Sequence, residues 1–280
     1  MPAAEGKTKM ISCACCSGLN FKPSLVCGDF YFVCCKKCGL VQRNPQPLKE
    51  EITKRYASTY GDDYLSYELQ NEDSFLKLQQ LALADAGFGK LENTLLAGDG
   101  GPPYALDIGC ATGALLSRLQ TGGWRVTGVE ISPSAKYARD TRNLDVRNIP
   151  LEENNFPDNI FDTVLASHLI EHLNDPKYFL HEIYRILKKN GRCFLTTPNI
   201  RGFQARLFGS RWRSAIFDHL YLFSDITLSK MLKNEGFKIE SIRTWGGLAS
   251  GAAASWLKKP ADFLAKKFNF GDVMIIRAVR

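Results

Sequence analysis

Hydrophobic residues follow two alternating patterns from residue 104 onward. Short apolar runs typical of buried strands are separated by stretches in which apolar residues recur every three or four positions, as on one face of a helix. The predicted strands span 104–108, 125–130, 161–166, 192–197, 238–244 and 272–278, and the helices between them span 114–120, 134–142, 176–188 and 226–234. This alternation predicts an α/β fold with a parallel sheet covered by helices on both faces.

Breaks in this pattern divide the chain into three predicted units. Residues 1–48 are rich in cysteine and end in Asn44-Pro45-Gln46-Pro47, a linker-like string that cannot continue a helix. Residues 49–100 have helical periodicity and are predicted to form a linker or cap. Residues 101–280 are predicted to form the main α/β domain, in which 199–222 interrupts the alternation and is interpreted as an insertion.

The composition is ordinary for a globular protein, with 45% hydrophobic and 23% charged residues among 280. No apolar run reaches the ~18–20 residues needed to cross a membrane. The first twenty residues lack the basic-then-apolar layout of a signal peptide, so we expect a cytoplasmic protein. The net charge is +7, with the positive charge concentrated toward both ends. This distribution favours either an acidic partner or a solvated basic surface.

Seven of the nine cysteines lie between residues 13 and 38, which in a reducing compartment favours a metal site over disulfides. Cys13 and Cys16 form one C-x2-C pair, and Cys35 and Cys38 form a second pair. This spacing is typical of a zinc ribbon, in which four thiolates surround a structural Zn²⁺. The alternatives are redox-active thiols, a metal-free cluster, or a site in which a neighbouring thiol replaces one of the four. The candidates for such a replacement are Cys15, Cys27 and Cys34.

A strand, a glycine turn and a helix are predicted at Leu106–Gly113 (LDIGCATG). Gly109 lets the backbone approach a ligand, and Gly113 allows tight helix packing. Asp107 could bind an ammonium group, and Glu130, at the end of the next strand, could accept hydrogen bonds from both hydroxyls of a ribose. The glycines do not match the G-x-G-x-x-G of a dinucleotide site, and Asp107 would repel a diphosphate. A ligand with an amine, a carboxylate and an adenosine fits better, and S-adenosylmethionine is such a ligand.

With these residues the sequence resembles the class I S-adenosylmethionine-dependent methyltransferases over about residues 100–280. The segments that carry the resemblance are Leu106–Gly113, Val129-Glu130, Phe161-Asp162, Ser167–Leu173 (SHLIEHL), Leu187–Thr197, His219–Phe223 and Gly236-Phe237. The resemblance implies a Rossmann-like class I sheet and a cofactor site made of Asp107, Gly109, Cys110, Gly113, Glu130, Ile131, Asn148, Ile149 and Ser167. It places Asn148 and Ile149 beside the adenine, and Ser167 and His168 beside the sulfonium. Ala111 departs from the family pattern, where many members have glycine.

The order of the three predicted units, together with three short segments, carries a second resemblance. A four-cysteine ribbon, a tyrosine-bearing linker and a class I core resemble a group of bacterial methyltransferases, many of which act on sugars or other small metabolites. The segments CGLVQRNPQP at 38–47, RLFGSRW at 206–212 and DHLYLFS at 218–224 are similar to that group. The resemblance implies a small-molecule or glycan acceptor.

Histidines supply the candidate chemistry. His168, Glu171 and His172 are spaced i, i+3 and i+4 and would share one helical face, and His219 falls in the insertion. In one mechanism, His219 or His168 acts as a general base on an acceptor hydroxyl. In the other, these residues hold a divalent cation that lowers the pKa of the hydroxyl. A similar constellation occurs in small-RNA 2′-O-methyltransferases and ubiquinone-pathway O-methyltransferases, which have glutamate in place of His168. A purely structural role for Glu171-His172 is the third interpretation.

These features predict an enzyme that transfers a methyl group from S-adenosylmethionine to an oxygen or carbon of a small acceptor. The acceptor is expected to carry a sugar or phosphate, as nucleotide-linked and lipid-linked glycans do. A phosphate could be held by the arginines of the insertion, namely Arg201, Arg206, Arg211 and Arg213, with Trp212 or Phe208 stacked on a ring. The alternatives are an RNA methyltransferase that grips phosphates with its ribbon and basic tail, and a cofactor-binding module without catalysis. The oligomeric state stays open.

Overall fold

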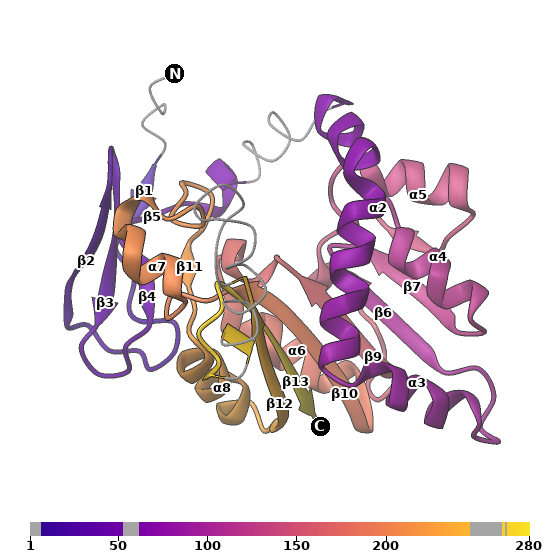
Figure 1. The fold of residues 1–280 in the computed structure, drawn as a ribbon. Coiled ribbons are helices and arrows are strands. Elements are labelled where there is room, and N and C mark those ends of the chain that lie inside the picture. The colour runs from indigo at the N-terminus through magenta and orange to yellow at the C-terminus, as the bar shows by residue number, and fades with distance from the viewer. Residues whose placement is uncertain (1–6, 53–61, 247–264, 267) are drawn as a thin grey trace, which may run out of the picture.

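A seven-stranded sheet forms the centre of the molecule, with the strand order β12-β13-β10-β9-β6-β7-β8 (Figure 1). The computed structural model describes residues 7–52, 62–246, 265–266 and 268–280. The strands of the central sheet are β6 (Tyr104–Ile108), β7 (Arg125–Val129), β8 (Val146–Arg147), β9 (Phe161–Ser167), β10 (Leu187–Pro198), β12 (Lys238–Trp245) and β13 (Val273–Val279). The predicted α/β fold with a Rossmann-like sheet is confirmed.

One strand departs from the predicted parallel arrangement. β13 runs antiparallel to both of its neighbours, β10 and β12, whereas the pairs among β10, β9, β6, β7 and β8 are parallel. The expectation of a uniformly parallel sheet is therefore wrong at this position. Residues 273–276 are all buried, so their apolar run fits a central strand of either direction, and periodicity alone carries no directional signal.

Helices cover both faces of the sheet, as the alternation predicts. One face packs against α2 (Asp62–Asp85), α3 (Phe88–Leu96), α4 (Ala114–Thr121) and α5 (Ser134–Arg142), and the other against α6 (Pro176–Ile186) and α8 (Asp225–Asn234). Neighbouring strand residues divide between the two layers. Leu165 and Ile275 belong to the first, and Val164 and Ile276 to the second. No helix within the described residues is both long and apolar enough to cross a membrane.

The helix predicted at 176–188 is two residues too long. Asp175 caps α6 by accepting a hydrogen bond from the Tyr178 amide, and Pro176 occupies the first turn. The helix ends at Ile186, and Leu187 already belongs to β10, which was predicted to begin only at residue 192. The pairing of β10 with β9 shifts register between Leu187 and Arg192, where Asn190 has a φ of 64°. This irregularity explains why the segment does not show strand periodicity.

The N-terminal unit contains two small antiparallel sheets, and the insertion adds a strand to the larger one. It contains β1 (Thr8–Lys9), β2 (Phe21–Cys27), β3 (Phe30–Cys35), β4 (Val41–Arg43) and β5 (Gln46–Pro47). β4 pairs with β3 on one side and with β11 (Tyr221–Leu222) on the other. The insertion also contains α7 (Phe203–Phe208), and Figure 1 shows α7 and β11 between the N-terminal strands and the central sheet. The N-terminal unit and the main domain are therefore joined by a shared sheet.

Two regions predicted to contain helix extend beyond the described residues. Residues 53–61 of the expected linker and residues 247–264 between the last two strands lie outside the described residues. The visible part of the linker contributes α2, which runs across the sheet toward α3 (Figure 1).

Gly128 in β7 provides a test of the packing between β7 and α4. A Cβ atom there would lie 2.6 Å from the Cys110 Sγ and 2.7 Å from the Leu116 Cδ1. We expect Gly128→Ala to lower the free energy of unfolding by about 1–3 kcal/mol because the core cannot accommodate the methyl group. The matched control is Gly89→Ala in α3, where a Cβ would meet nothing within 4 Å. It should raise the free energy of unfolding by about 0.5 kcal/mol. Urea unfolding followed by circular dichroism measures both, and equal stability of the two variants would contradict this account.

Candidate functional site

A cavity of about 1360 Å³ opens at the carboxyl ends of the central strands. Gly109 and Glu130, from the predicted cofactor site, line it together with His168, His172 and His219, from the predicted catalytic group. The walls are completed by residues of α2 and of the insertion. Ligands of open α/β sheets bind at this edge. One cavity therefore brings together two residue groups that are far apart in the sequence.

The glycine turn after β6 has the backbone geometry expected for close approach to a ligand. Gly109 has a φ of 75°, which favours glycine, and its amide donates a hydrogen bond to the Val129 carbonyl at 2.7 Å. Gly113 has a φ of 79°, and a Cβ there would lie 2.5 Å from the Leu144 Cδ1. Ala111 also has a positive φ, of 49°. The turn thus passes close to the cavity at Gly109 and packs tightly at Gly113.

Glu130 follows β7 and is held by two backbone amides. Its Oε2 accepts a hydrogen bond from the Ala111 amide at 3.0 Å, and its Oε1 accepts one from the Ser132 amide at 2.8 Å. Asn148 donates its side-chain amide to the Glu130 carbonyl at 2.7 Å. Each carboxylate oxygen can accept further hydrogen bonds. The carboxylate is therefore fixed in position and can still accept hydroxyl donors from a ligand.

The remaining predicted cofactor residues divide into two groups. Cys110, Ile131 and Ser167 line the cavity, whereas Asp107, Gly113, Asn148 and Ile149 are not among its lining residues in the described chain. Asp107 is buried at the end of β6. Burial raises the pKa of its carboxyl to about 8, and the nearby charge of Glu130 adds to this effect. The carboxyl of Asp107 is therefore mainly protonated near pH 7, and a cation bound beside it would favour the ionised form.

Two glutamates of α2 join this site, and the sequence analysis did not identify them. Glu68 accepts a hydrogen bond from the Ser134 hydroxyl, and burial raises its pKa to about 7. Glu72 accepts a hydrogen bond from the Thr112 hydroxyl and forms an ion pair with Arg142. Their i, i+4 spacing was visible in the sequence, but nothing local indicated that this helix reaches the glycine turn.

The backbone that carries His168, Glu171 and His172 is not the predicted α-helix. His168 has a φ of 52°, and Ile170–His172 is a single 3₁₀ turn, so the expectation of one α-helical face is wrong. The side chains nevertheless meet. The His168 Nδ1 lies 3.4 Å from the Glu171 Oε1, and ligand atoms of Glu171, His172 and His219 all lie within 4.8 Å of one another. The ring centroids of His172 and His219 are 4.7 Å apart.

Backbone carbonyls fix the tautomers of two of these histidines. The Nδ1 of His219 is 2.8 Å from the Ser214 carbonyl oxygen, and the Nδ1 of His172 is 3.1 Å from the Asp218 carbonyl oxygen. A carbonyl oxygen only accepts, so each Nδ1 carries the proton and each Nε2 has a lone pair. Burial, with a smaller effect of His172, lowers the pKa of His219 to about 4. His219 is therefore neutral near pH 7.

Glu171 carries a buried negative charge. Its side chain is 1% exposed, and Oε2 accepts a hydrogen bond from the Thr197 hydroxyl at 2.9 Å. Burial alone would raise its pKa, but the contact with His168 and the positive charge that the neighbouring histidines carry when protonated outweigh burial and lower the pKa to about 2. Oε1 has no hydrogen-bond partner among the described residues. An ionised carboxylate oxygen beside two imidazole lone pairs is a donor set that suits a divalent cation.

The arginines of the insertion do not form the predicted cluster. Arg201 pairs with Asp225 at 2.9 Å, and only Arg213 lines the cavity. Trp212 is buried in a core with Phe32 and Leu222, so the expectation that it stacks on a ligand ring is wrong.

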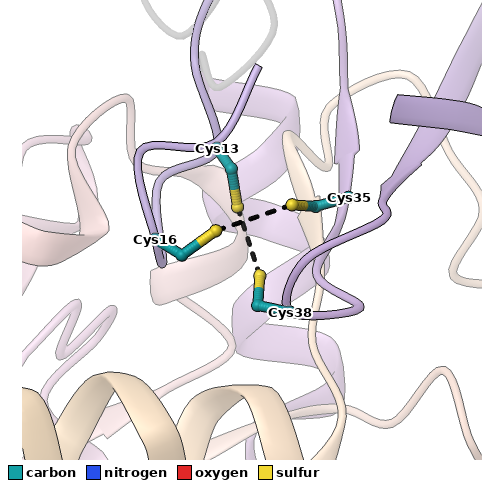
Figure 2. Close-up of side chains that lie close together, drawn as sticks. All are labelled: Cys13, Cys16, Cys35 and Cys38. Carbon is teal, nitrogen blue, oxygen red and sulfur yellow. Dashed lines mark hydrogen bonds between the residues drawn. The ribbon is translucent and has the colours of Figure 1, made fainter. Parts of the chain in front are cut away.

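The four predicted cysteine ligands meet in the N-terminal unit (Figure 2). The Sγ atoms of Cys13 and Cys38 are 3.4 Å apart, and those of Cys16 and Cys35 are 3.6 Å apart. A tetrahedral Zn²⁺ with Zn–S bonds of about 2.3 Å needs similar separations between sulfurs. The three surplus thiols are not in this group, although the Cys15 thiol interacts with that of Cys38. Cys27 contacts the Ser210 carbonyl, Cys34 contacts the Gly39 carbonyl, and Cys15 is outside the group. The four thiols could therefore hold zinc.

The two neighbouring cysteines Cys34 and Cys38 provide a matched test of this centre. We expect the purified protein to contain one Zn²⁺ per chain and Cys34→Ser to retain it. Cys38→Ser should lose the metal and lower the thermal unfolding temperature, because metal binding contributes folding energy to a unit this small. Elemental analysis by mass spectrometry, with thermal unfolding in parallel, measures both effects. Equal zinc content in the two variants would remove Cys38 from the ligand set.

Comparison with known proteins identifies the core. The sequence model of the family described as "Methyltransferase domain" matches residues 81–242, more than half of the chain. The chain is 25% identical over 184 residues to a ubiquinone biosynthesis O-methyltransferase of Rickettsia conorii, which covers 58% of this chain and 62% of that protein. It is 39% identical over 100 residues to the protein of the same name from Bradyrhizobium diazoefficiens, covering 34% and 39%. The chain spans less than two thirds of the length of each relative.

Solved structures share the fold. A methyltransferase of Archaeoglobus fulgidus that is S-adenosylmethionine dependent aligns with a TM-score of 0.53 at 21% identity, over 76% of this chain and 99% of that one. A complex of the Haloferax volcanii Trm112 methyltransferase activator with a methyltransferase aligns with a TM-score of 0.54 at 19% identity, over 78% and 97%. Given the family match and these folds, the chain belongs to the methyltransferase-domain family and has the class I core of S-adenosylmethionine-dependent methyltransferases.

Proposed function

We propose that this protein transfers a methyl group from S-adenosylmethionine to a hydroxyl oxygen of a small acceptor that carries a sugar or an anionic group. One observation carries the proposal. Glu130 and Gly109 line the same cavity as His172 and His219. These two histidines form one cluster with Glu171. In a methyl transfer the acceptor atom and the methyl donor must be aligned within one enclosure.

In this proposal the residues around the glycine turn bind the cofactor. Glu130, whose two oxygens are already oriented by backbone amides, takes the ribose hydroxyls. Asp107 binds the ammonium of the methionine part, whose positive charge would offset the burial that raises the pKa of this carboxyl and so favour its ionised form. Asn148 holds the backbone of Glu130, and Ser167 ends the strand that faces the reacting sulfur.

The cluster of Glu171, His172 and His219 fits a divalent cation. The fit rests on the buried Glu171 Oε1 without a hydrogen bond and on the Nε2 lone pairs that the two carbonyl contacts fix. Such an ion, when bound, lowers the pKa of an acceptor hydroxyl. Thr197 holds the Glu171 carboxylate, and the Ser214 and Asp218 carbonyls orient the two imidazoles.

His168 is placed to remove the hydroxyl proton. Its side chain is half exposed, lines the cavity and lies directly after Ser167. The ion pair with Glu171 stabilises the imidazolium that forms when the proton arrives. His172 and His219 would then hold the cation together with Glu171, and His168 serves as the general base.

Two observations support an oxygen acceptor with an anionic group. Both relatives reported above are named O-methyltransferases. Among the described lysines and arginines of the cavity wall, Lys49 pairs with Glu152, Lys266 pairs with Asp85, and Arg213 forms no ion pair within 4 Å. Arg213 is exposed on the side of the insertion. A carboxylate or phosphate of the acceptor would be attracted to this guanidinium.

Methyl-labelled S-adenosylmethionine and a fractionated extract of the source cells test the function. We expect label in the small-molecule or glycan fraction, as a methyl ether. Glu130→Ala, the control, should weaken cofactor binding at least about tenfold because hydrogen bonds to a charged group are lost. Label in RNA would contradict the proposed acceptor. A wild-type protein that does not bind the cofactor would contradict the function itself.

The state of Asp107 makes cofactor affinity depend on pH. The pKa of its carboxyl in the free protein, about 8, lies above the unfolded value of about 4, so the free native state gains stability as pH falls below 8. The ammonium of the cofactor binds the ionised form. Affinity should therefore rise between pH 6 and 7.5, by at most about tenfold per pH unit.

Isothermal titration calorimetry in buffers of different ionisation enthalpy measures this affinity and the proton released on binding. Asp107→Asn should weaken binding and flatten its pH dependence. Glu68→Gln is the control for the second raised carboxyl of this site and should keep the contribution of Asp107. An affinity of the wild type that does not change with pH would contradict the ammonium-binding role of Asp107.

A further inference from the structure

The chain segment between the cysteine unit and α2 is polar and yet buried. Gln42, Arg43, Asn44 and Gln46 are 0%, 7%, 2% and 1% exposed. Buried polar side chains are stable only when they are hydrogen-bonded. The prolines at the end of this segment predict a linker, but a linker has no reason to bury four polar side chains. Their partners show what the segment connects.

On one side the segment is bound to the first pair of cysteines. The Gln42 side chain accepts a hydrogen bond from the Ala14 amide and donates one to the Ser12 carbonyl, both at 3.2 Å. These two residues flank Cys13. The Asn44 side chain forms two further hydrogen bonds with the backbone of Ile11, at 3.0 and 2.9 Å. The position of β4 is therefore set by the backbone that carries the first zinc ligands.

On the other side Arg43 holds both ends of the segment that contains His219. The Arg43 amide donates to the Leu220 carbonyl at 2.8 Å, and its Nη1 donates to the Phe217 carbonyl at 2.8 Å. The guanidinium Cζ lies 3.9 Å from the centroid of the Phe217 ring. The strand pairing of β4 with β11 starts directly after this point. His219 thus lies between two residues that Arg43 fixes.

The same short segment is bound to the other members of the histidine cluster. The Asp218 carbonyl accepts the hydrogen bond from the His172 Nδ1, and the Leu220 amide donates to the Glu171 carbonyl at 2.8 Å. Two backbone groups of residues 217–220 thus connect this segment to Glu171 and His172, while the Ser214 carbonyl orients the His219 ring from the preceding turn. Arg43 holds both ends of this segment, the Leu220 carbonyl through its backbone amide and Phe217 through its side chain.

We propose that Arg43 is a positioning residue for His219 and His172, so that the four-cysteine unit forms part of the acceptor side of the active site. The proposal rests on the proposed function of the histidine cluster. A guanidinium suits this task because it donates in a fixed plane while its face stacks on an aromatic ring, and an ammonium cannot do both. Loss of Arg43 leaves the cofactor residues untouched, since none of them contacts residues 217–220 in the interactions described above.

The test compares Arg43→Met, which keeps the volume but cannot donate, with Arg43→Lys, which retains one donor. Lys22→Met is the matched control, because Lys22 is an exposed cation on β2 of the same sheet. We expect Arg43→Met to lower kcat at least about tenfold, since small displacements of catalytic groups have effects of this size. The dissociation constant of S-adenosylmethionine and the zinc content should remain unchanged, and Arg43→Lys should recover part of kcat.

A second readout does not depend on turnover. In the wild type, imidazole ¹⁵N NMR should show His172 and His219 as single Nδ1–H tautomers because of their carbonyl partners. Arg43→Met should mix the tautomers, and Lys22→Met should not. A variant that loses thermal stability while it keeps kcat and both tautomers would show that Arg43 is only structural, which would overturn the inference. A wild type without methyl transfer would refute the proposed function, and the NMR comparison would then still decide the role of Arg43.

Discussion

The buried carboxylate of Glu171 is the constraint on which the histidine cluster depends. An ionised carboxylate taken out of water is stable only with hydrogen bonds and positive charge around it, and the effective penalty is several kcal/mol per ion otherwise. The surrounding residues come from three separate parts of the chain. Thr197 lies on β10, His168 and His172 flank the turn after β9, and His219 comes from the insertion. All three parts of the chain place a hydroxyl or an imidazole next to this one carboxylate.

The insertion can hold His219 beside Glu171 because its strand β11 pairs with β4 of the N-terminal unit. β11 has two residues and could not keep a fixed position alone. It adds to the edge of the N-terminal sheet, which also covers an edge that would otherwise be open to other strands. A unit of this size has little hydrophobic core of its own, and a metal held by the four thiols would contribute folding energy to it. The small sheet and the insertion therefore stabilise each other.

The sequence predicted those parts of the site that depend on local geometry. Gly109, Gly113 and Glu130 could be identified because a strand, a turn and a helix follow one another directly. The four cysteines could be identified as a group by spacing, but only their positions in space separated them from Cys15, Cys27 and Cys34. Glu68 and Glu72 could not be found, because docking of α2 on the glycine turn is a long-range contact. Arg43 was hidden because polar residues beside prolines look like a linker. The direction of β13 and the 3₁₀ turn at His172 leave no mark on hydrophobic periodicity.

Two carboxyl groups of the cavity wall, Glu68 and Glu130, have a consequence for the order of events after the reaction. S-adenosylmethionine carries a positive sulfonium, and the product of methyl transfer is a neutral thioether. With the proposed cofactor in place, the attraction between these carboxylates and the sulfonium disappears at the moment the methyl group leaves. The same wall therefore distinguishes the spent cofactor from the fresh one by charge. It favours exchange of one for the other without any movement of the protein.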